Sequence, residues 1–262
     1  MKDTLFINSP STDVYFNLAT EEFLLKNHTE NIFMLWQSTP SVILGKHQQA
    51  EAEINLDYVK AKQIRIARRY SGGGTVYHDP GNLNLTFIEN TTNPDFENYT
   101  RQILRFLETI GIHAQKDTRL GINIGRLKIS GSAQCIYKTR VLYHCTLLYS
   151  TDLIALNASL SARPETFVSQ RKYTVASVKS PVTNISTQLQ TPQNTGFFRK
   201  QVFSFFLGTV SPNRIYSLNP ADIAAITQLR ENKYATTAWI FRENTERPLP
   251  EHSTPEIRLI KE

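Results

Sequence analysis

The chain has 262 residues, of which 40% are hydrophobic and 20% charged, a balance typical of a globular protein with a sizeable core. Its net charge is +6, but the cations are scattered, which argues against nucleic-acid binding and would suit an acidic protein partner. Two cysteines exclude a disulfide framework, and no apolar run approaches the ~18 residues that span a bilayer. We therefore expect a cytoplasmic protein that binds neither nucleic acid nor a membrane.

In the amino-terminal part of the chain, the apolar residues predict two helices among several short strands. Asp13 can cap a helix that runs to residue 26, and a second helix is expected over residues 56–62. The strands are expected where short apolar or alternating stretches end at turn-forming residues. They cover residues 32–36, 42–44, 64–67, 75–77 and 83–88.

The rest of the chain continues this mixture. An amphipathic helix is predicted over residues 98–110, and Gly111 ends it. Residues 122–129 are typical of a hairpin that turns at Gly125, which puts Lys128 on the returning strand. The other expected elements are a strand over residues 141–148, helices over 153–160, 197–207 and 220–232, and a loop over most of 161–193. Such a mixture predicts an α+β fold, a mixed β-sheet with flanking helices.

The most informative stretch is residues 68–82, which read Arg-Arg-Tyr-Ser-Gly-Gly-Gly-Thr-Val-Tyr-His-Asp-Pro-Gly-Asn. Glycine loses extra backbone entropy on folding, so three in a row indicate that something comes close to this backbone. Their N–H groups could line a concavity with Arg68, Arg69 and His78 at its rim, which favours an anionic ligand. The alternative is a glycine-rich hairpin with surface arginines. The spacing matches neither the P-loop nor the dinucleotide-binding motif.

This stretch resembles the lipoate-protein ligase and lipoyltransferase family, whose pattern Arg-Arg-x-Ser-Gly-Gly-Gly-x-Val-x-His-Asp-x-Gly-Asn it matches without a gap. Other stretches match in the expected order, at residues 13–22, 35–36, 42–48, 128–134 and 144–148. The resemblance covers roughly residues 5–245. It implies the fold shared by biotin and lipoate protein ligases, with one catalytic domain over residues 1–245 and a polar tail over 246–262.

The chemistry that the resemblance implies is acyl transfer to a protein lysine. The family's ligases first make an acyl-adenylate with ATP and Mg²⁺, because a carboxylate is a poor acyl donor, and the acceptor amine then displaces AMP. The expected ligands are lipoate or lipoyl-AMP, with ATP and Mg²⁺ if the chain is a complete ligase. The expected partners are apo lipoyl domains of 2-oxoacid dehydrogenase complexes or of the glycine cleavage H protein.

By motif position, Lys128 resembles the family's essential lysine, whose charge would offset negative charge in the transition state. The residues expected at the acyl group are Trp36, Arg69, Ser71, Gly72, Gly73, Gly74, His78 and His144. Those expected at the nucleotide are Val76, Asn82 and Thr146. No metal ligand is assigned. A core tryptophan is the alternative for Trp36, and a strand-edge lysine is the alternative for Lys128.

Two departures from the family pattern bear on activation. Family ligases commonly carry Asn-Asp seven or eight residues before the lysine, whereas this chain has Leu120-Gly121, and its nearest acid is Asp117. Loss of that carboxylate would weaken Mg²⁺ binding. Many ligases also continue into an accessory domain after a tryptophan segment that residues 237–241 match. We expect this domain to be absent, so that a separate subunit completes the chain or the acyl group is activated elsewhere.

The predicted function is lipoyl or octanoyl transfer to a specific lysine of a lipoyl-carrier domain through an acyl-adenylate. One alternative is an octanoyltransferase or amidotransferase with a thiolate, which Cys145 suggests. Related enzymes of that type carry their cysteine elsewhere, so a small buried hydrophobe is the preferred interpretation of Cys145. Another alternative is a degenerate member that binds a lipoyl-like ligand or a carrier protein without turnover, which Gly121 favours.

Overall fold

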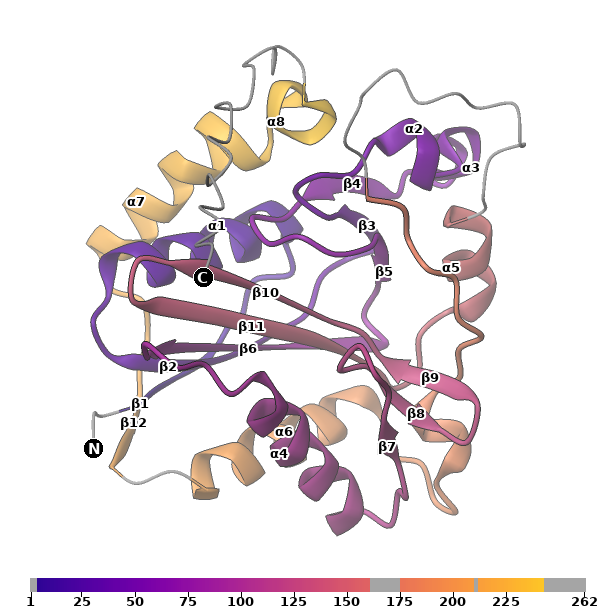
Figure 1. The fold of residues 1–262 in the computed structure, drawn as a ribbon. Coiled ribbons are helices and arrows are strands. Elements are labelled where there is room, and N and C mark those ends of the chain that lie inside the picture. The colour runs from indigo at the N-terminus through magenta and orange to yellow at the C-terminus, as the bar shows by residue number, and fades with distance from the viewer. Residues whose placement is uncertain (1–3, 161–174, 210–211, 243–262) are drawn as a thin grey trace, which may run out of the picture.

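The computed structural model of the protein describes residues 4–160, 175–209 and 212–242. Its centre is a six-stranded sheet with the strand order β10-β11-β6-β2-β1-β12 (Figure 1). These strands are β1 (Thr4–Asn8), β2 (Asn31–Trp36), β6 (Asn82–Asn90), β10 (Ser132–Tyr137), β11 (Arg140–Leu148) and β12 (Asn213–Ile215). β1 pairs in parallel with β2 and β12, whereas the remaining neighbours are antiparallel. The predicted α+β fold with a mixed sheet is therefore confirmed.

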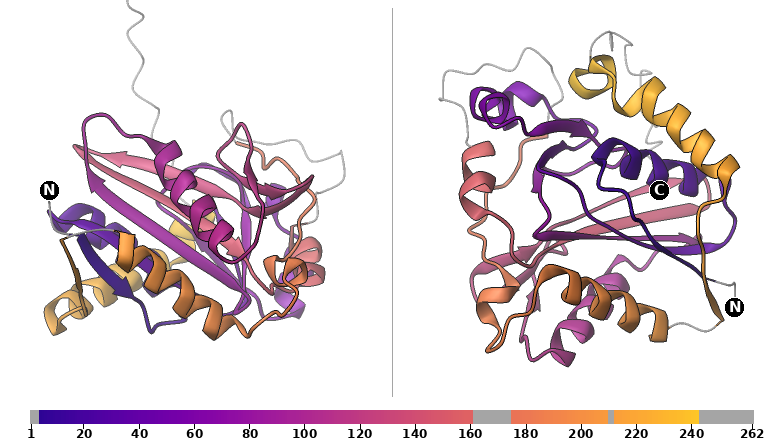
Figure 2. Two further views of the ribbon diagram at one scale, coloured as in Figure 1. Left: turned by 90° about the horizontal axis from the view of Figure 1, so that it is seen from below. Right: turned by 180° about the vertical axis from the view of Figure 1, so that it is seen from behind.

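β2 shows how this sheet separates two hydrophobic layers. Phe33 and Leu35 belong to one core cluster, and Ile32, Met34 and Trp36 belong to the other, because successive side chains of a strand point to opposite faces. Two helices, α4 (Phe96–Thr109) and α6 (Thr195–Thr209), cover the first face. Two others, α1 (Val14–Asn27) and α7 (Pro220–Leu229), cover the second, as Figures 1 and 2 show.

Two smaller sheets extend this core on the side where the predicted site residues lie. One has the order β4-β3-β5, and the other β7-β8-β9. Their strands are β3 (Ser41–Leu44), β4 (Arg65–Arg68), β5 (Val76–His78), β7 (Gln115–Lys116), β8 (Ile122–Ile124) and β9 (Leu127–Ser130). Three short helices pack on the first small sheet and form a third core cluster with it: α2 (Ala50–Glu53), α3 (Leu56–Ala61) and α5 (Leu153–Ser159).

The elements with a strong local signal lie where the sequence predicts them. Asp13 caps α1, since its side chain accepts a hydrogen bond from the Tyr15 backbone. Gly111 follows α4 with φ +78°, and Gly125 turns the β8–β9 hairpin with φ +57°. Lys128 lies on the returning strand β9, as expected.

Other elements differ from the prediction. The elements that the sequence did not predict are β1, β7, β10, β12, α2, a 3₁₀ turn at Ile185–Gln188 and a last helix, α8 (Thr237–Phe241). The helix predicted over 220–232 ends at Leu229 and continues as a π-helical turn, Arg230–Tyr234. Residues 161–174 of the predicted loop and the predicted tail over 246–262 lie outside the described residues.

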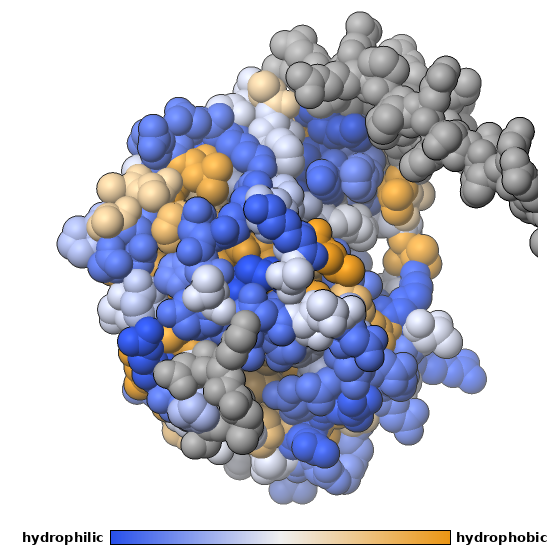
Figure 3. Space-filling view, turned by 60° about the vertical axis from the view of Figure 1, so that its left-hand side comes forward, coloured by the Kyte–Doolittle hydropathy of each residue, from blue (hydrophilic) through white to orange (hydrophobic). Residues whose placement is uncertain are grey.

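The described surface is consistent with this buried core. On the face shown in Figure 3, hydrophobic residues appear in small groups between hydrophilic ones. Among the described residues, no helix has the length and apolar character needed to cross a membrane.

Candidate active site

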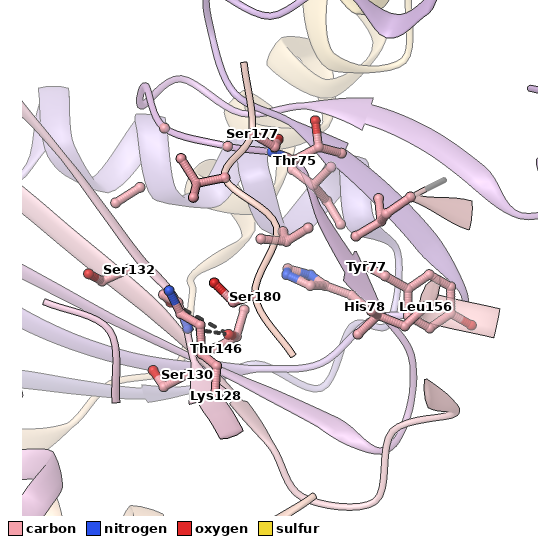
Figure 4. Close-up of a pocket in the computed structure, with 18 of the residues that line it drawn as sticks. Thr75, Tyr77, His78, Lys128, Ser130, Ser132, Thr146, Leu156, Ser177 and Ser180 are labelled. Carbon is pink, nitrogen blue, oxygen red and sulfur yellow. Dashed lines mark hydrogen bonds between the residues drawn. The ribbon is translucent and has the colours of Figure 1, made fainter. Parts of the chain in front are cut away.

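A cavity of about 820 Å³ lies between the glycine run and the strands that carry Lys128 and His144. Its walls include residues of α1, β2, β3, β5, β9, β10, β11 and α5, together with residues 175–182. Figure 4 shows Lys128, Ser130 and Thr146 on one side of it and Tyr77 and His78 on the other. The apolar part of the wall includes Leu18, Trp36, Ile43, Val76, Ala133, Leu148 and Leu156. Apolar walls with a few converging polar groups are typical of a small-molecule site.

Arg69 fixes the shape of the glycine run. Its Nη2 donates to the carbonyl oxygens of Gly72 and Gly74, at 2.6 and 2.7 Å, and its Nε donates to Ser71 Oγ at 3.0 Å. Burial lowers the pKa of Arg69 to about 10, although the Glu21 carboxylate acts in the opposite direction. Arg69 therefore remains a cation at neutral pH, and it uses most of its donors on the protein's own backbone.

The close approach that the glycines predict is made by the protein itself. Gly73 has φ +85°, and a Cβ there would lie 2.9 Å from Arg69 Nη2. A Cβ on Gly45 would lie only 2.0 Å from the Gly73 carbonyl oxygen. A Cβ on Gly74 would lie 3.1 Å from Ser177 Oγ. The glycines thus allow β3, the Arg69 side chain and the covering segment to pack on one loop.

Arg68 does not lie at the rim of the cavity, so that part of the prediction is wrong. Its side chain is 1% exposed. Its guanidinium donates to the carbonyl oxygens of Gly45 and Gln48, both at 2.7 Å, and of Ile240 at 2.8 Å. A buried guanidinium with several carbonyl acceptors stabilises the packing of distant backbone segments.

A buried chain of hydrogen bonds joins the glycine run to α1. His144 Nε2 lies 2.7 Å from Ser71 Oγ, and His144 Nδ1 lies 3.0 Å from Glu21 Oε1. Thr86 donates to the Glu21 carboxylate, and Trp36 Nε1 donates to Thr86 Oγ1. The order serine, histidine, acid is that of a hydrolase triad. Ser71 is 1% exposed and does not line the cavity. These hydrogen bonds therefore hold the glycine loop in place, and Ser71 is not presented to the cavity as a nucleophile.

His78 has hydrogen-bonding capacity that the described residues leave unused. It is 4% exposed and lines the cavity, and neither ring nitrogen has a partner among the described residues. Burial and the charge of Arg69 lower the pKa of His78 to about 3. The imidazole is therefore neutral at physiological pH, with one N–H donor and one acceptor for a bound ligand.

β9 holds Lys128 on the opposite wall. The Lys128 backbone N–H donates to the Pro181 carbonyl at 2.8 Å, and the Lys128 carbonyl accepts from the Thr183 N–H at 3.0 Å. Its Nζ lies 3.6 Å from Asp117 Oδ2. The side chain is 20% exposed and lines the cavity, so the ammonium group is only partly covered by the protein.

The segment over residues 175–182 is tied across the cavity by residues that the sequence analysis missed. Ser177 Oγ accepts from the Thr75 N–H at 2.8 Å and from Gln48 Nε2 at 2.9 Å. Gln48 Oε1 in turn accepts from Thr75 Oγ1 at 2.8 Å. Gln48 lies in residues 42–48, which resemble the family. This match was the sequence signal that could have predicted a role for Gln48 at the site.

Comparison with known proteins decides the family. Residues 13–207 match the model of the lipoyl protein ligase A/B catalytic domain. The chain belongs to the lipoate-protein ligase and lipoyltransferase family. The resemblance found at residues 68–82 is therefore confirmed.

Two curated relatives illustrate the range of this family. Lipoate–protein ligase 1 of Staphylococcus aureus is 36% identical over 242 residues, covering 90% of this chain and 73% of the relative. The human mitochondrial lipoyl amidotransferase LIPT1 is 32% identical over 249 residues, covering 92% of this chain and 66% of the relative.

Solved structures of the family share the fold. A bi-partite lipoate protein ligase from Thermoplasma acidophilum, studied with its E2 lipoyl domain, has a TM-score of 0.76 at 26% identity, covering 92% of this chain and 96% of that one. A lipoate-protein ligase A bound with ATP has a TM-score of 0.74 at 27% identity, covering 92% and 98%. P. falciparum LipL1 in complex with lipoate has a TM-score of 0.72 at 26% identity, covering 94% and 75%.

The structure brings most of the predicted ligase-family site residues to one cavity. Those that line it are Trp36, Arg69, Gly73, Gly74, Val76, His78, Lys128, His144 and Thr146. Thr146 Oγ1 accepts from the Gly131 N–H at 3.1 Å, which joins β11 to the end of β9. Ser71, Gly72 and Asn82 do not line the cavity. Asn82 is fully buried and donates to Asn84 Oδ1, and the residue Asn84 does line the cavity.

Asp117 is a carboxylate that could serve an Mg²⁺ ion bound together with a nucleotide. No group of three or more His, Cys, Asp or Glu that could hold a metal alone is found in the described part of the chain. Mg²⁺ in phosphate-transfer sites commonly takes one or two carboxylates and completes its shell with phosphate oxygens and water. Asp117, beside Lys128, offers one such carboxylate.

The two cysteines are not activated thiols. Burial raises the pKa of Cys145 to about 12, and it raises the pKa of Cys135 to about 12 as well. A nucleophilic thiolate needs the opposite shift. These values favour the interpretation of Cys145 as a small buried hydrophobe over the thiolate alternative.

Proposed function

We propose that this chain transfers a lipoyl group from lipoyl-adenylate to the amine of a specific lysine on a lipoyl-carrier domain. Membership of the lipoate ligase family makes it an enzyme of protein lipoylation. The observation that carries the proposal is the cavity itself. Its apolar wall lies between the Lys128 ammonium group and the neutral imidazole of His78, whose ring nitrogens have no partner among the described residues.

The residues of the cavity divide the work of this reaction. Trp36, Ile43 and Val76 would contact the hydrocarbon chain of the lipoyl group. The Lys128 ammonium would offset the negative charge that grows on the carbonyl and phosphate oxygens. The acceptor amine then attacks the carbonyl carbon, an amide C–N bond forms, the C–O bond to AMP breaks, and the amine proton leaves to AMP or water.

Several finer points belong to this proposal. Lipoate and ATP are ligands of related structures. Apo lipoyl domains of 2-oxoacid dehydrogenase complexes or of the glycine cleavage H protein would be the acceptors, and the net charge of +6 suits an acidic acceptor surface. Residues 1–245 would form the catalytic domain, and a separate accessory subunit would assist it. The two free thiols suit a reducing compartment such as the cytoplasm.

A second candidate function is transfer of an acyl group that another enzyme has activated or carried. Gly121, in place of the family's acid, favours it, and so does the similarity to a lipoyl amidotransferase. A binding protein without turnover is disfavoured by the placement of Lys128 and His78 at the cavity.

The test supplies purified protein and apo lipoyl domain with preformed lipoyl-AMP and follows the mass of the domain. We expect a mass gain of one lipoyl group at one lysine. A parallel reaction with an octanoylated carrier protein as the donor tests the second candidate. Absence of modification with both donors would reject catalysis.

A further inference from the structure

Asp117 and Lys128 occupy the space that a side chain at position 121 would enter. A Cβ built on Gly121 would lie 2.5 Å from Asp117 Oδ2 and 2.7 Å from Lys128 Nζ. These distances are shorter than van der Waals contact, so the carboxylate of Asp117 stands where an acidic side chain at residue 121 would begin. The backbone of Gly121 is not in the left-handed region, so its conformation does not itself require glycine.

The turn between β7 and β8 explains how Asp117 reaches this place. Lys116 pairs with Ile122, so residues 117 and 121 face each other at the base of the turn. The Asp117 N–H donates to the Gly121 carbonyl at 2.8 Å. Asp117 Oδ1 accepts from the backbone N–H groups of Arg119 and Gly121, both at 2.8 Å. The side chain of residue 117 is thereby folded back over residue 121.

The two carboxylate oxygens of Asp117 have different surroundings. Oδ1 serves the turn, whereas Oδ2 makes no hydrogen bond to any described residue and lies 3.6 Å from Lys128 Nζ. Burial raises the pKa of Asp117, but the two backbone hydrogen bonds and the Lys128 charge outweigh it and hold the pKa below its usual range. Asp117 is therefore an anion at neutral pH, with one oxygen available beside the cavity.

We propose that Asp117 takes the place of the acid that family ligases commonly carry at the position of Gly121, and that this chain makes its own lipoyl-adenylate. The inference rests on the proposed function. In this step a lipoate carboxylate oxygen forms a bond to the α-phosphorus of ATP, and the bond from that phosphorus to pyrophosphate breaks. Asp117 acts as a positioning residue that orients Lys128 and offers Oδ2 to the Mg²⁺ of the nucleotide.

The first test compares Asp117→Asn with Asp95→Asn. Asparagine keeps an oxygen for the turn and removes the charge at Oδ2. Asp95 is an exposed helix cap, where the same exchange keeps a capping residue. We expect Asp117→Asn to slow lipoyl-AMP formation from lipoate and Mg-ATP by about 10-fold or more. Calorimetry of ATP binding, with Mg²⁺ and with a chelator, should show that this variant loses the affinity gained from Mg²⁺, while Asp95→Asn keeps it.

A second variant moves the carboxylate back to position 121. In Asp117→Ser with Gly121→Asp, the shorter serine vacates the space of Oδ2 and still offers a hydroxyl to the turn. We expect this pair to recover lipoyl-AMP formation and Mg²⁺-dependent ATP binding relative to Asp117→Ser alone. Recovery would support the inference, since a purely structural role of Asp117 predicts further loss on adding an acid at residue 121.

The outcomes separate this inference from the proposed function. If the unaltered protein modifies the lipoyl domain with lipoyl-AMP but forms no lipoyl-AMP from lipoate and Mg-ATP, the inference is overturned and transfer stands. If Asp117→Asn forms lipoyl-AMP as fast as Asp95→Asn, the inference is also overturned. If the unaltered protein transfers from no donor, the proposed function itself fails.

Discussion

Arg69 and Lys128, two of the cations that line the cavity, stand on opposite walls and are used differently. Arg69 is 5% exposed and donates to the carbonyls of the glycine run and to Ser71. Lys128 is 20% exposed. Among the described residues, its ammonium group forms one ion pair, with Asp117. A guanidinium whose donors are taken up by backbone carbonyls shapes a wall, whereas an ammonium group with one ion pair at 3.6 Å can also contact a ligand. The motif surrounding each cation does not distinguish these tasks.

The largest effect is expected from Lys128→Ala. Loss of a charge that stabilises developing negative charge should lower the transfer rate from lipoyl-AMP by about 10²–10³-fold. The measurement is the single-turnover rate of lipoyl-domain modification. Because the ion pair with Asp117 is near the surface, stability should fall by less than about 1 kcal/mol. Lys60→Ala, on the exposed side of α3, is the matched control, and an equal rate in both variants would remove Lys128 from the reaction.

Arg69→Lys should mainly lower the free energy of unfolding of the protein. A lysine ammonium cannot reproduce the planar fork, so at least one carbonyl among those of Gly72 and Gly74 loses its partner. We expect a loss of about 3 kcal/mol in the free energy of unfolding. Denaturant titration measures this value, with the exposed Arg105→Lys as control. An unchanged unfolding midpoint would show that Arg69 is not the residue that shapes the loop.

The pH dependence of stability tests His78. The unfolded chain takes up a proton near the ordinary value of 6.5, whereas folded His78 does so only near 3. The unfolded state therefore binds more protons between these values, and this residue should lower the free energy of unfolding by about 1.4 kcal/mol per pH unit as the pH falls through that window. His78→Gln should remove this component. Parallel pH profiles of both proteins would contradict a buried neutral imidazole.

Cys145→Ala should have the smallest effect. Its thiol remains protonated at neutral pH, since its pKa is raised to about 12, so the variant should keep most of its transfer activity. The loss of a small buried side chain should cost about 1 kcal/mol of stability, measured by thermal unfolding. Complete loss of transfer in a folded variant would instead support a thioester mechanism.

The sequence predicted the parts of this fold that local signals determine. The cap at Asp13 and the turn at Gly125 are examples, because capping and positive φ act within a few residues. β12 was missed because Asn213–Ile215 is an exposed, largely polar strand that exists only through pairing with β1. β10 was missed because its first half, Ser132-Ala133-Gln134, lacks the β-branched and aromatic residues typical of strands, and it is paired with β11.

The site shows the same limit. Motif positions located Lys128 and His78 at one cavity, but a motif does not say which atoms a side chain contacts. Arg68 was expected at a rim and is buried under α8, whereas Asp117 was noted only as the nearest acid in the sequence. The Arg68 assignment depends on a contact with Ile240, 172 positions away, whereas the Asp117 assignment depends on how its turn folds back beside Lys128.

The buried Arg68 has a consequence for the order in which the protein can form. Its hydrogen bond to the Ile240 carbonyl joins residues 172 positions apart. In the same way, β1 pairs with β12, which lies near the other end of the described chain. During synthesis, which proceeds from the amino terminus, the segment carrying the glycine run is therefore complete long before its last backbone partners leave the ribosome. Such non-local closure slows folding. The nascent glycine loop would therefore lack these backbone partners until the carboxy-terminal segment has emerged.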